Sequence, residues 1–366
     1  MKFVKIFFPC LILVVGVVIS SCRQSAKNES VSEEIVTMIE NLDQHYDSLY
    51  VFLSGCYDAE KGGFYEFIGA SGEPKLESTA RAITMLEKAE MLSEMPAGMK
   101  LSIIKYLQNM QNPETGFFED LQEKRDPENR RGRAFGYSVN TLGKLGAEPL
   151  YPLPTTKSKV GVEHIQSAGV FVNWMQNLDW DKPWKAGAAI SSQSILIKNL
   201  PDSLKNAIID AAFDWLAENQ DAETGWWGND SPYQMLSGAF KLSNFYQAFS
   251  RPMPNADKIY QSILKVLREE QCSDGCWVRN PLHLLNVIKP GYENISVMEK
   301  EEIIRISIRN ILNLERKDGG FAQNTHQKYS VTDGCSQAMK TRDAVRELAG
   351  LTNKPFPNGD LFFKEK

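Results

Sequence analysis

Apolar residues recur along most of the 366-residue chain at spacings of three and four positions, which is the period of one face of an α-helix. Residues Phe171 to Leu178 and Ile304 to Leu312 show this period clearly. Alternation of apolar and polar residues between Asn-Gly or Asp-Gly turns, which predicts strands and hairpins, is scarce. The pattern therefore predicts an all-α fold.

A short phrase interrupts the helical pattern about six times, with its aromatic residues roughly 45 to 65 positions apart. In each copy an apolar run ends near a Gln or Asn, an acidic turn with glycine follows, and an aromatic residue closes the turn. The clear copies are Phe52–Phe64, Tyr106–Phe118, Trp215–Trp227, Val266–Trp277 and Asn310–Phe321, and a copy without glycine is Asn173–Trp184. This period is long enough for one helical hairpin per unit.

Small residues open a second helix after most copies of the phrase, at positions 78–80, 132–134, 186–188, 237–239 and 333–335. Small side chains let helices pack closely near an axis, whereas Trp, Phe and Leu mark the helices outside them. We therefore predict that residues 34–352 form an (α/α)6 toroid, a double barrel of six hairpins, with residues 353–366 as a C-terminal tail. The inner helices should surround a central cavity that the turns open at one end.

The parts of the phrase have architectural roles in this prediction. Glycine in the turn can adopt positive φ without a Cβ penalty. The aromatic residue after it should fill the seam between adjacent hairpins. The preceding Gln or Asn should bond the backbone groups that a helix end leaves free.

The N-terminus has the features of an export signal. Residues 1–21 carry Lys2 and Lys5 before an apolar stretch that is short for a membrane-spanning helix, the alternative interpretation. The following Ser20-Ser21-Cys22 resembles the bacterial lipobox, which implies cleavage before Cys22 and lipidation of that residue. Residues 22–33 are polar and predict a flexible tether. We expect a lipid-anchored protein of the bacterial cell envelope, at the outer rather than the inner membrane.

Charge and cysteine content narrow the classes of partner. The formal net charge is −5, and loss of Lys2 and Lys5 with the signal makes it −7. The densest basic cluster, Arg125–Arg133, is local, so the sequence predicts no nucleic-acid partner. Beyond the signal and Cys22 the chain has four cysteines, Cys56, Cys272, Cys276 and Cys335, whose disulfide state the sequence leaves open.

The repeated Gln-to-Gly-aromatic phrase resembles the repeats of the terpenoid cyclase and protein prenyltransferase superfamily over nearly the whole mature chain. The resemblance implies the same toroid and, because other functions also use this fold, says little about activity. In prenyltransferases an Asp-Gly-Cys tripeptide supplies zinc ligands, which correspond here to Asp333 and Cys335. The family's histidine ligand is absent from its expected helix near Thr79–Glu90, so we expect no cofactor, with zinc as the alternative.

Two other signatures of toroid proteins are incomplete in this chain. The acidic motif of squalene-type cyclases corresponds to residues 179–182, where Lys182 replaces the last aspartate. The thioester signature is not matched at residues 334–337.

Polar and aromatic residues near the starts of the predicted inner helices are the candidate binding residues. They are Arg133, Tyr137, Trp184, Lys185, Tyr233, Lys241, Asn280 and His326. Such mixtures suit an extended glycan or peptide ligand. His283, where an inner helix is expected to begin, and Asp333 are the catalytic candidates.

Three hypotheses follow for the function. We favour a lipid-anchored module that binds a glycan or peptide in the central cavity, without intact prenyltransferase or cyclase motifs. The first alternative is a polysaccharide-acting enzyme of the envelope. The second is a divergent zinc-dependent prenyltransferase or terpene cyclase relative.

Overall fold

The computed structural model describes residues 30–120, 127–154, 161–289 and 295–364 of the chain. All of its helices and strands belong to one compact unit, Val31–Lys366. The predicted signal and the lipidation residue Cys22 lie outside the described residues. Within the described residues no helix is long and apolar enough to cross a bilayer.

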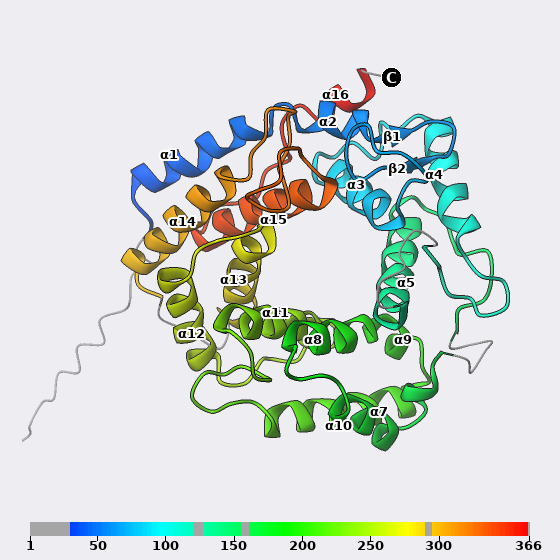
Figure 1. The fold of residues 1–366 in the computed structure, drawn as a ribbon, viewed down its shortest axis with the longest axis vertical. Helices are drawn as coiled ribbons and strands as arrows, with labels where there is room; N and C mark the ends of the chain where they lie inside the picture. Colours follow the sequence, from blue (N-terminus) through cyan, green and yellow to red (C-terminus); the bar gives the residue numbers. More distant parts are fainter. Residues whose placement is uncertain (1–29, 121–126, 155–160, 290–294, 365–366) are drawn as a thin grey trace, which may run out of the picture. The chain divides into compact units, whose positions relative to one another are not determined.

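Six helices form an inner ring in this unit (Figure 1). Each helix contacts the next one along the chain, and the last contacts the first, so the ring closes. The inner helices are α3 (Leu76–Lys88), α5 (Pro127–Lys144), α8 (Pro183–Ser192), α11 (Pro232–Ala248), α13 (Gly275–Ile288) and α15 (Thr332–Leu348).

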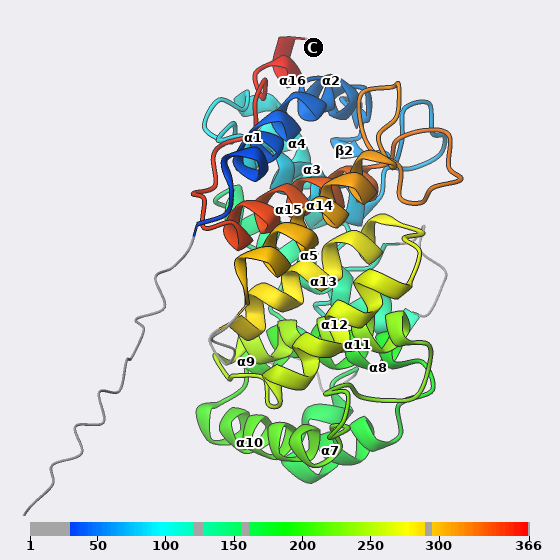
Figure 2. The same ribbon diagram turned by 90° about the vertical axis from the view of Figure 1, so that its left-hand side faces the viewer.

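A second layer of helices packs outside this ring. Figure 2 shows α12 and α14 lying over α13 and α15, which they contact. The outer helices are α1 (Glu33–Asn41), α2 (Leu49–Gly55), α4 (Ala97–Asn109), α7 (Ala168–Gln176), α10 (Asp202–Glu218), α12 (Ala256–Glu269) and α14 (Val297–Leu312). From α2 onward, outer and inner helices alternate along the chain apart from the short α9, which confirms the predicted all-α toroid.

Short elements connect the two layers. The first turn contains strands β1 (Tyr57–Asp58) and β2 (Gly63–Phe64), which pair antiparallel with Tyr57 opposite Phe64. The remaining elements are the 3-10 helices η1 (Leu42–Tyr46) and η2 (Glu163–Ile165) and the helices α9 (Ser194–Lys198) and α16 (Leu361–Lys364). Phe356 and Phe362 are buried in the core, so the C-terminal segment packs as part of the ring.

The glycine of each cleanest phrase is required both by its backbone angle and by its neighbours. Gly116 and Gly225 have φ of +76° and +72°, as predicted for a turn that favours glycine. A Cβ on Gly116 would lie 2.2 Å from the carbonyl oxygen of Pro152, and one on Gly225 would lie 2.8 Å from the nitrogen of Ile259. Each turn therefore docks closely against the backbone of the next unit.

The glutamines of the phrase form hydrogen bonds, but not with the backbone groups at the helix end that we predicted. Gln111 donates to the carbonyl oxygens of Gly116 and Tyr151, and Gln220 donates to those of Gly225 and Pro254. These amides fasten the turn to the following loop rather than bonding groups at the helix end. The following residues, Asn112 and Asp221, accept backbone N–H groups within the turn.

The copy at Val266–Trp277 departs from the others. Gly275 does not have positive φ and is the first residue of α13, where the Asp274 side chain accepts a hydrogen bond from the backbone N–H of Trp277. A Cβ on Gly275 would lie 3.1 Å from the Cβ of Gln337 on α15. Close helix packing, and not a turn, accounts for this glycine.

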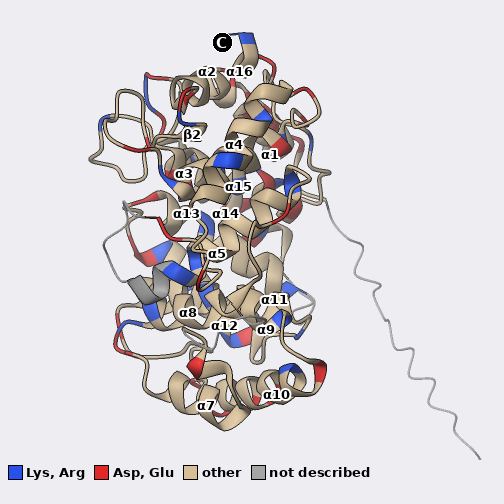
Figure 3. Cartoon of the chain, turned by 90° about the vertical axis from the view of Figure 1, so that its right-hand side faces the viewer, with Lys and Arg blue, Asp and Glu red and all other residues tan. Residues whose placement is uncertain are grey.

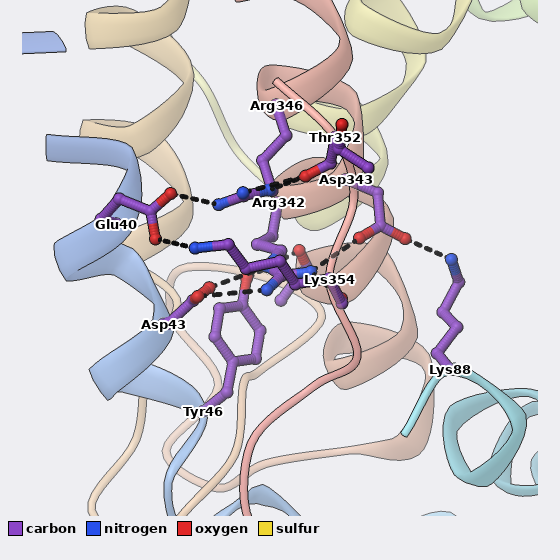
Figure 4. A network of polar contacts seen from close by, with 10 residues as sticks. Glu40, Asp43, Tyr46, Lys88, Arg342, Asp343, Arg346, Thr352 and Lys354 are labelled. Atoms are coloured by element: carbon purple, nitrogen blue, oxygen red, sulfur yellow. Dashed lines mark hydrogen bonds and ion pairs between the residues drawn. The ribbon is translucent and has the colours of Figure 1, made fainter. Parts of the chain in front are cut away.

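Charged side chains join the two ends of the chain where the ring closes (Figure 4). Arg342 on α15 is fully buried and donates to both carboxylate oxygens of Asp43, at 2.8 and 3.1 Å. It also donates to the carbonyl oxygen of Lys354 at 2.6 Å and lies 4.4 Å from the centre of the Phe356 ring. Arg346, one helical turn later, pairs with Glu40 of α1. These contacts hold α15, the N-terminal segment and the C-terminal segment together.

Candidate functional site

Polar residues form a stripe along several inner helices, at the spacing of one helix face. On α13 the stripe is Cys276, Arg279 and His283, and on α15 it is Asp333, Gln337 and Lys340. The stripes on α3, α5 and α11 add Glu77 with Arg81, Arg133 with Tyr137, and Lys241. We refer to Glu77, Arg81, Arg133, Lys241, Arg279, Asp333 and Lys340 as the central cluster.

Four members of the central cluster form a chain of ion pairs. Arg133 Nη2 lies 2.5 Å from Glu77 Oε1, and Arg81 pairs with the same oxygen. Arg81 Nη1 lies 2.5 Å from Asp333 Oδ1, which also accepts a hydrogen bond from Gln337 Nε2 at 2.8 Å. The chain links α5, α3 and α15, so the paired charges of three inner helices fix one another in position.

The other three members, Lys241, Arg279 and Lys340, form no ion pair with any described residue. Two of them lie over one aromatic ring instead. The guanidinium carbon of Arg279 is 4.3 Å from the centre of the Phe240 ring, and Lys241 Nζ is 5.2 Å from it. The aromatic face attracts both cations and holds them beside each other without neutralising their charge.

The cluster converges from opposite sides of the ring. In ring order α11 lies opposite α3, and α13 lies opposite α5. Lys241 of α11 interacts electrostatically with Glu77 of α3, and Arg279 of α13 does so with Tyr137 of α5. Side chains from opposite inner helices are therefore close enough across the ring to interact.

Water nevertheless reaches the centre of the ring. The side chains of Glu77 and Asp333 retain 26% and 32% of their exposure, although both belong to inner helices. Lys241, Arg279 and Lys340 are likewise half-buried. On the side of the unit drawn in Figure 3, positive and negative residues are interspersed over the elements. The excess of cations at the ring centre contrasts with that mixture.

The surroundings shift the pKa values of these cations downward. Burial lowers the pKa of Lys241 to about 8, and the charge of Arg133 adds to this effect. Burial likewise lowers the pKa of Arg279 to about 10, so this group stays charged at neutral pH. The pKa of Lys340 falls well below its usual value because of burial and the adjacent charge of Arg279. The centre therefore brings together basic groups whose charged forms are disfavoured by burial and by repulsion from neighbouring arginines.

The structure brings some of the predicted binding residues to this centre and leaves others elsewhere. Arg133, Tyr137 and Lys241 belong to it, and Asn280 is buried beside it, donating to Ser237 Oγ at 3.2 Å. Tyr233 packs against Trp277 with ring centres 6.0 Å apart.

Three other predicted residues lie apart from the central cluster. Trp184 is half-buried at the start of α8. Lys185 is exposed and lines a separate pocket of about 410 Å³. His326 is exposed on the loop between α14 and α15, in another surface pocket.

Asp333 and Cys335, the predicted zinc ligands, lie in different environments. Asp333 is held by Arg81 and Gln337, and its helix begins after Val331, so it does not cap α15. Cys335 is fully buried, and its sulfur accepts the backbone N–H of Phe321 at 3.3 Å. Burial raises the pKa of the Cys335 thiol far above its usual value, which opposes the thiolate that zinc binds. Among the described residues no group of three or more His, Cys, Asp or Glu side chains could hold a metal ion.

His283 lies in the middle of α13 rather than at its start, because that helix already begins at Gly275. Its ring packs edge-on against Phe240 with ring centres 5.2 Å apart. Burial, with the charges of Arg279 and Lys340, lowers the pKa of His283 to about 3. The imidazole is therefore neutral at neutral pH, and its catalytic assignment stays a prediction.

Sequence reasoning missed Arg81, Arg279, Lys340 and Glu77. Each is a charged residue within a helix whose neighbours are buried, for example Arg279 between Val278 and Asn280. A charged side chain in such a helix must have a polar environment to face. That signal was available, but the direction of each side chain depends on how the helices pack.

No protein-family model and no curated protein matches this chain. The solved structures that are similar to this chain include the following two. One is an inactive variant of the α-1,6-mannanase GH76A of Salegentibacter sp. HEL1_6 with α-1,6-mannotriose, at 12% identity and a TM-score of 0.45, covering 86% of this chain and 99% of that one. The other is a variant of the type II terpene cyclase MstE from Scytonema with geranylgeranyl dihydroxybenzoate, at 12% identity and a TM-score of 0.44, covering 87% and 99%.

Proposed function

We propose that the protein is a lipid-anchored binding protein of the bacterial envelope that holds an extended glycan at the centre of its helical ring. The observation that supports this function is the central cluster, in which polar side chains from five inner helices meet where water still reaches them. Hydrogen-bonding groups that converge from several rigid elements can fix the orientation of a polar ligand. A ring of packed helices keeps those groups in place.

The chemistry of the centre favours a glycan over a peptide. Proteins commonly bind peptides as an added strand at a sheet edge or as a helix in an apolar groove. In the described part of the chain the strands are the two-residue β1 and β2, and both lie in the turn of the first hairpin. The inner faces carry charged groups and amides rather than an apolar groove. These donors suit hydroxyl and acidic groups of sugars.

Blocking the centre with a large side chain should weaken ligand binding. Thr84 of α3 is half-buried, and its hydroxyl accepts a hydrogen bond from Lys144 of α5. In Thr84→Trp an indole should occupy the ligand's space, so we expect at least about a tenfold loss of affinity. A glycan array probed with the chain that lacks the signal and Cys22 would identify candidate ligands. Calorimetry would then measure their affinities for each variant.

The matched control is Lys105→Trp, which adds the same ring to an exposed position of the outer helix α4. It should bind as the parent chain does. Urea unfolding of both variants would show that they are folded. Equal affinity for Thr84→Trp and Lys105→Trp would place the ligand outside the ring and contradict the proposal.

The lipid anchor is proposed from the Ser20-Ser21-Cys22 sequence alone. Expressed with its signal, the wild-type chain should enter the detergent-rich phase of Triton X-114, and its mature form should begin at residue 22 with added acyl mass. Cys22→Ala should stay in the aqueous phase or keep its signal. A Cys22→Ala protein that is processed and partitions like the wild type would refute the anchor.

A further inference from the structure

The charge of the ring centre is opposite to that of the chain. The whole sequence has a formal net charge of −5. The central cluster nevertheless contains five cations, Arg81, Arg133, Lys241, Arg279 and Lys340, against the two carboxylates of Glu77 and Asp333. Composition therefore does not explain the positive centre, and the fold itself gathers these cations.

Ion pairs between inner helices explain the positions of only some cations in the central cluster. Arg81 and Arg133 use Glu77 and Asp333, and they join neighbouring helices. Lys241, Arg279 and Lys340 form no ion pair with a described residue, and Arg279 repels both lysines. Placing like charges together in a partly desolvated site costs free energy. A ligand that supplies the missing negative charge would offset that cost.

We infer that Lys241, Arg279 and Lys340 form an anion site, and that the ligand of the ring centre is an acidic glycan whose carboxylate groups they hold. The inference rests on the proposed function, since it names the class of glycan bound at the same site. An Arg guanidinium can bind a carboxylate through two parallel hydrogen bonds, and the two ammonium groups add further charged donors.

The aromatic residues of the centre support an acidic rather than a neutral sugar. A neutral sugar is commonly bound by stacking on an open aromatic face. The Phe240 ring is covered by Arg279 and Lys241. The guanidinium carbons of Arg81 and Arg133 lie 6.0 and 5.9 Å from the centre of the Tyr137 ring. The faces of these two rings thus position cations.

The test compares matched charged and neutral ligands. Hexamers of galacturonic, glucuronic and mannuronic acid would be titrated beside their methyl esters, which keep the sugar and remove the charge. We expect at least one acid to bind at least about tenfold more tightly than its ester. Binding of that acid should weaken as salt is added, because salt screens the attraction.

Substitutions of Lys241 and Arg279 distinguish a role in ligand binding from a role in the stability of the fold. In Lys241→Met with Arg279→Met, the acid should bind about a hundredfold more weakly, roughly tenfold for each lost cation. Because neither residue has an ion-pair partner among the described residues, this double variant should be as resistant to urea as the wild type or more so. A purely structural role would instead lower the resistance. Lys258→Met, which removes one exposed charge from the outer helix α12, should bind normally.

Each contrary outcome has a distinct meaning. Equal binding of acid and ester, both blocked by Thr84→Trp, would overturn the anion site and leave the proposed glycan function standing. Acid binding that Thr84→Trp does not weaken would overturn the proposed function and this inference together. Tighter binding of polyglutamate or inorganic diphosphate than of any uronic acid would show that the ligand is another kind of anion, and would overturn the acidic glycan. No binding of any uronic acid at millimolar concentration would also overturn the inference.

Discussion

Arg342→Met should lower the free energy of unfolding by about 3 kcal/mol, the largest effect we expect from a single charged residue of this chain. The Arg342 side chain has no solvent exposure, and its removal leaves the Asp43 carboxylate and the Lys354 carbonyl oxygen without their partner. Asp43 keeps 24% of its exposure, so water can solvate it in part and the cost stays near the lower end for a broken buried pair. The cation over Phe356 is lost as well.

Urea unfolding of the chain starting at Arg23 would measure this change. The control is Arg305→Gln, because Arg305 of α14 pairs on the surface with Glu34 of α1, the helix that directly precedes Asp43. An exposed pair of this kind adds little, so the control should unfold like the wild type. Equal unfolding midpoints for Arg342→Met and Arg305→Gln would show that the buried arginine does not secure the ring closure.

Gly334→Ala should destabilise the protein by about 2 to 3 kcal/mol through overpacking. A Cβ at this position would lie 2.3 Å from the carbonyl oxygen of Phe321 and 2.4 Å from that of Ala322. Both atoms belong to the backbone of the last turn, which accepts a hydrogen bond from Val331 at the start of α15. The helix would have to move away from the turn, because a backbone cannot rotate aside as a flexible side chain can.

Gly136→Ala makes the same chemical change where there is room. Among the described residues, no atom outside the backbone of α5 lies within 4 Å of a Cβ built on Gly136, which is inside that helix. Alanine is the better helix former, so this variant should gain about 0.5 to 1 kcal/mol. Thermal and urea unfolding of the two variants would give the comparison. A loss for Gly136→Ala as large as for Gly334→Ala would refute the packing explanation.

The ring could be predicted because its determinants are local. Glycines such as Gly116 and Gly225 occupy positive-φ turns, and the buried aromatic residues after them, such as Phe118 and Trp227, follow directly in sequence. The same reasoning was wrong for Gly275, which looks identical in sequence but begins a helix. Its role depends on Gln337, a residue that only the packing of α13 against α15 brings near.

The site was harder to predict because its members are brought together from opposite helices. Lys241 and Asn280 were predicted as binding residues, whereas Arg279, which directly precedes Asn280, and Lys340 were not, although they lie no deeper in their helices. Nothing in the local sequence says that Arg279 lies over the Phe240 ring as Lys241 does. Which side chains meet at the centre depends on the rotation of each helix about its own axis. Contacts with the neighbouring helices determine that rotation.

The buried contacts of Arg342 and Arg346 also determine when the ring can be completed. Asp43 and Arg342 are 299 positions apart, and Glu40 and Arg346 are 306 apart. Contacts between residues so far apart in the sequence form slowly, because a long loop must close before they can stabilise the fold. They also require α15, which is synthesised after the other five inner helices. The chain therefore remains an open arc until its sixth inner helix has been made, and only then can it become a closed toroid.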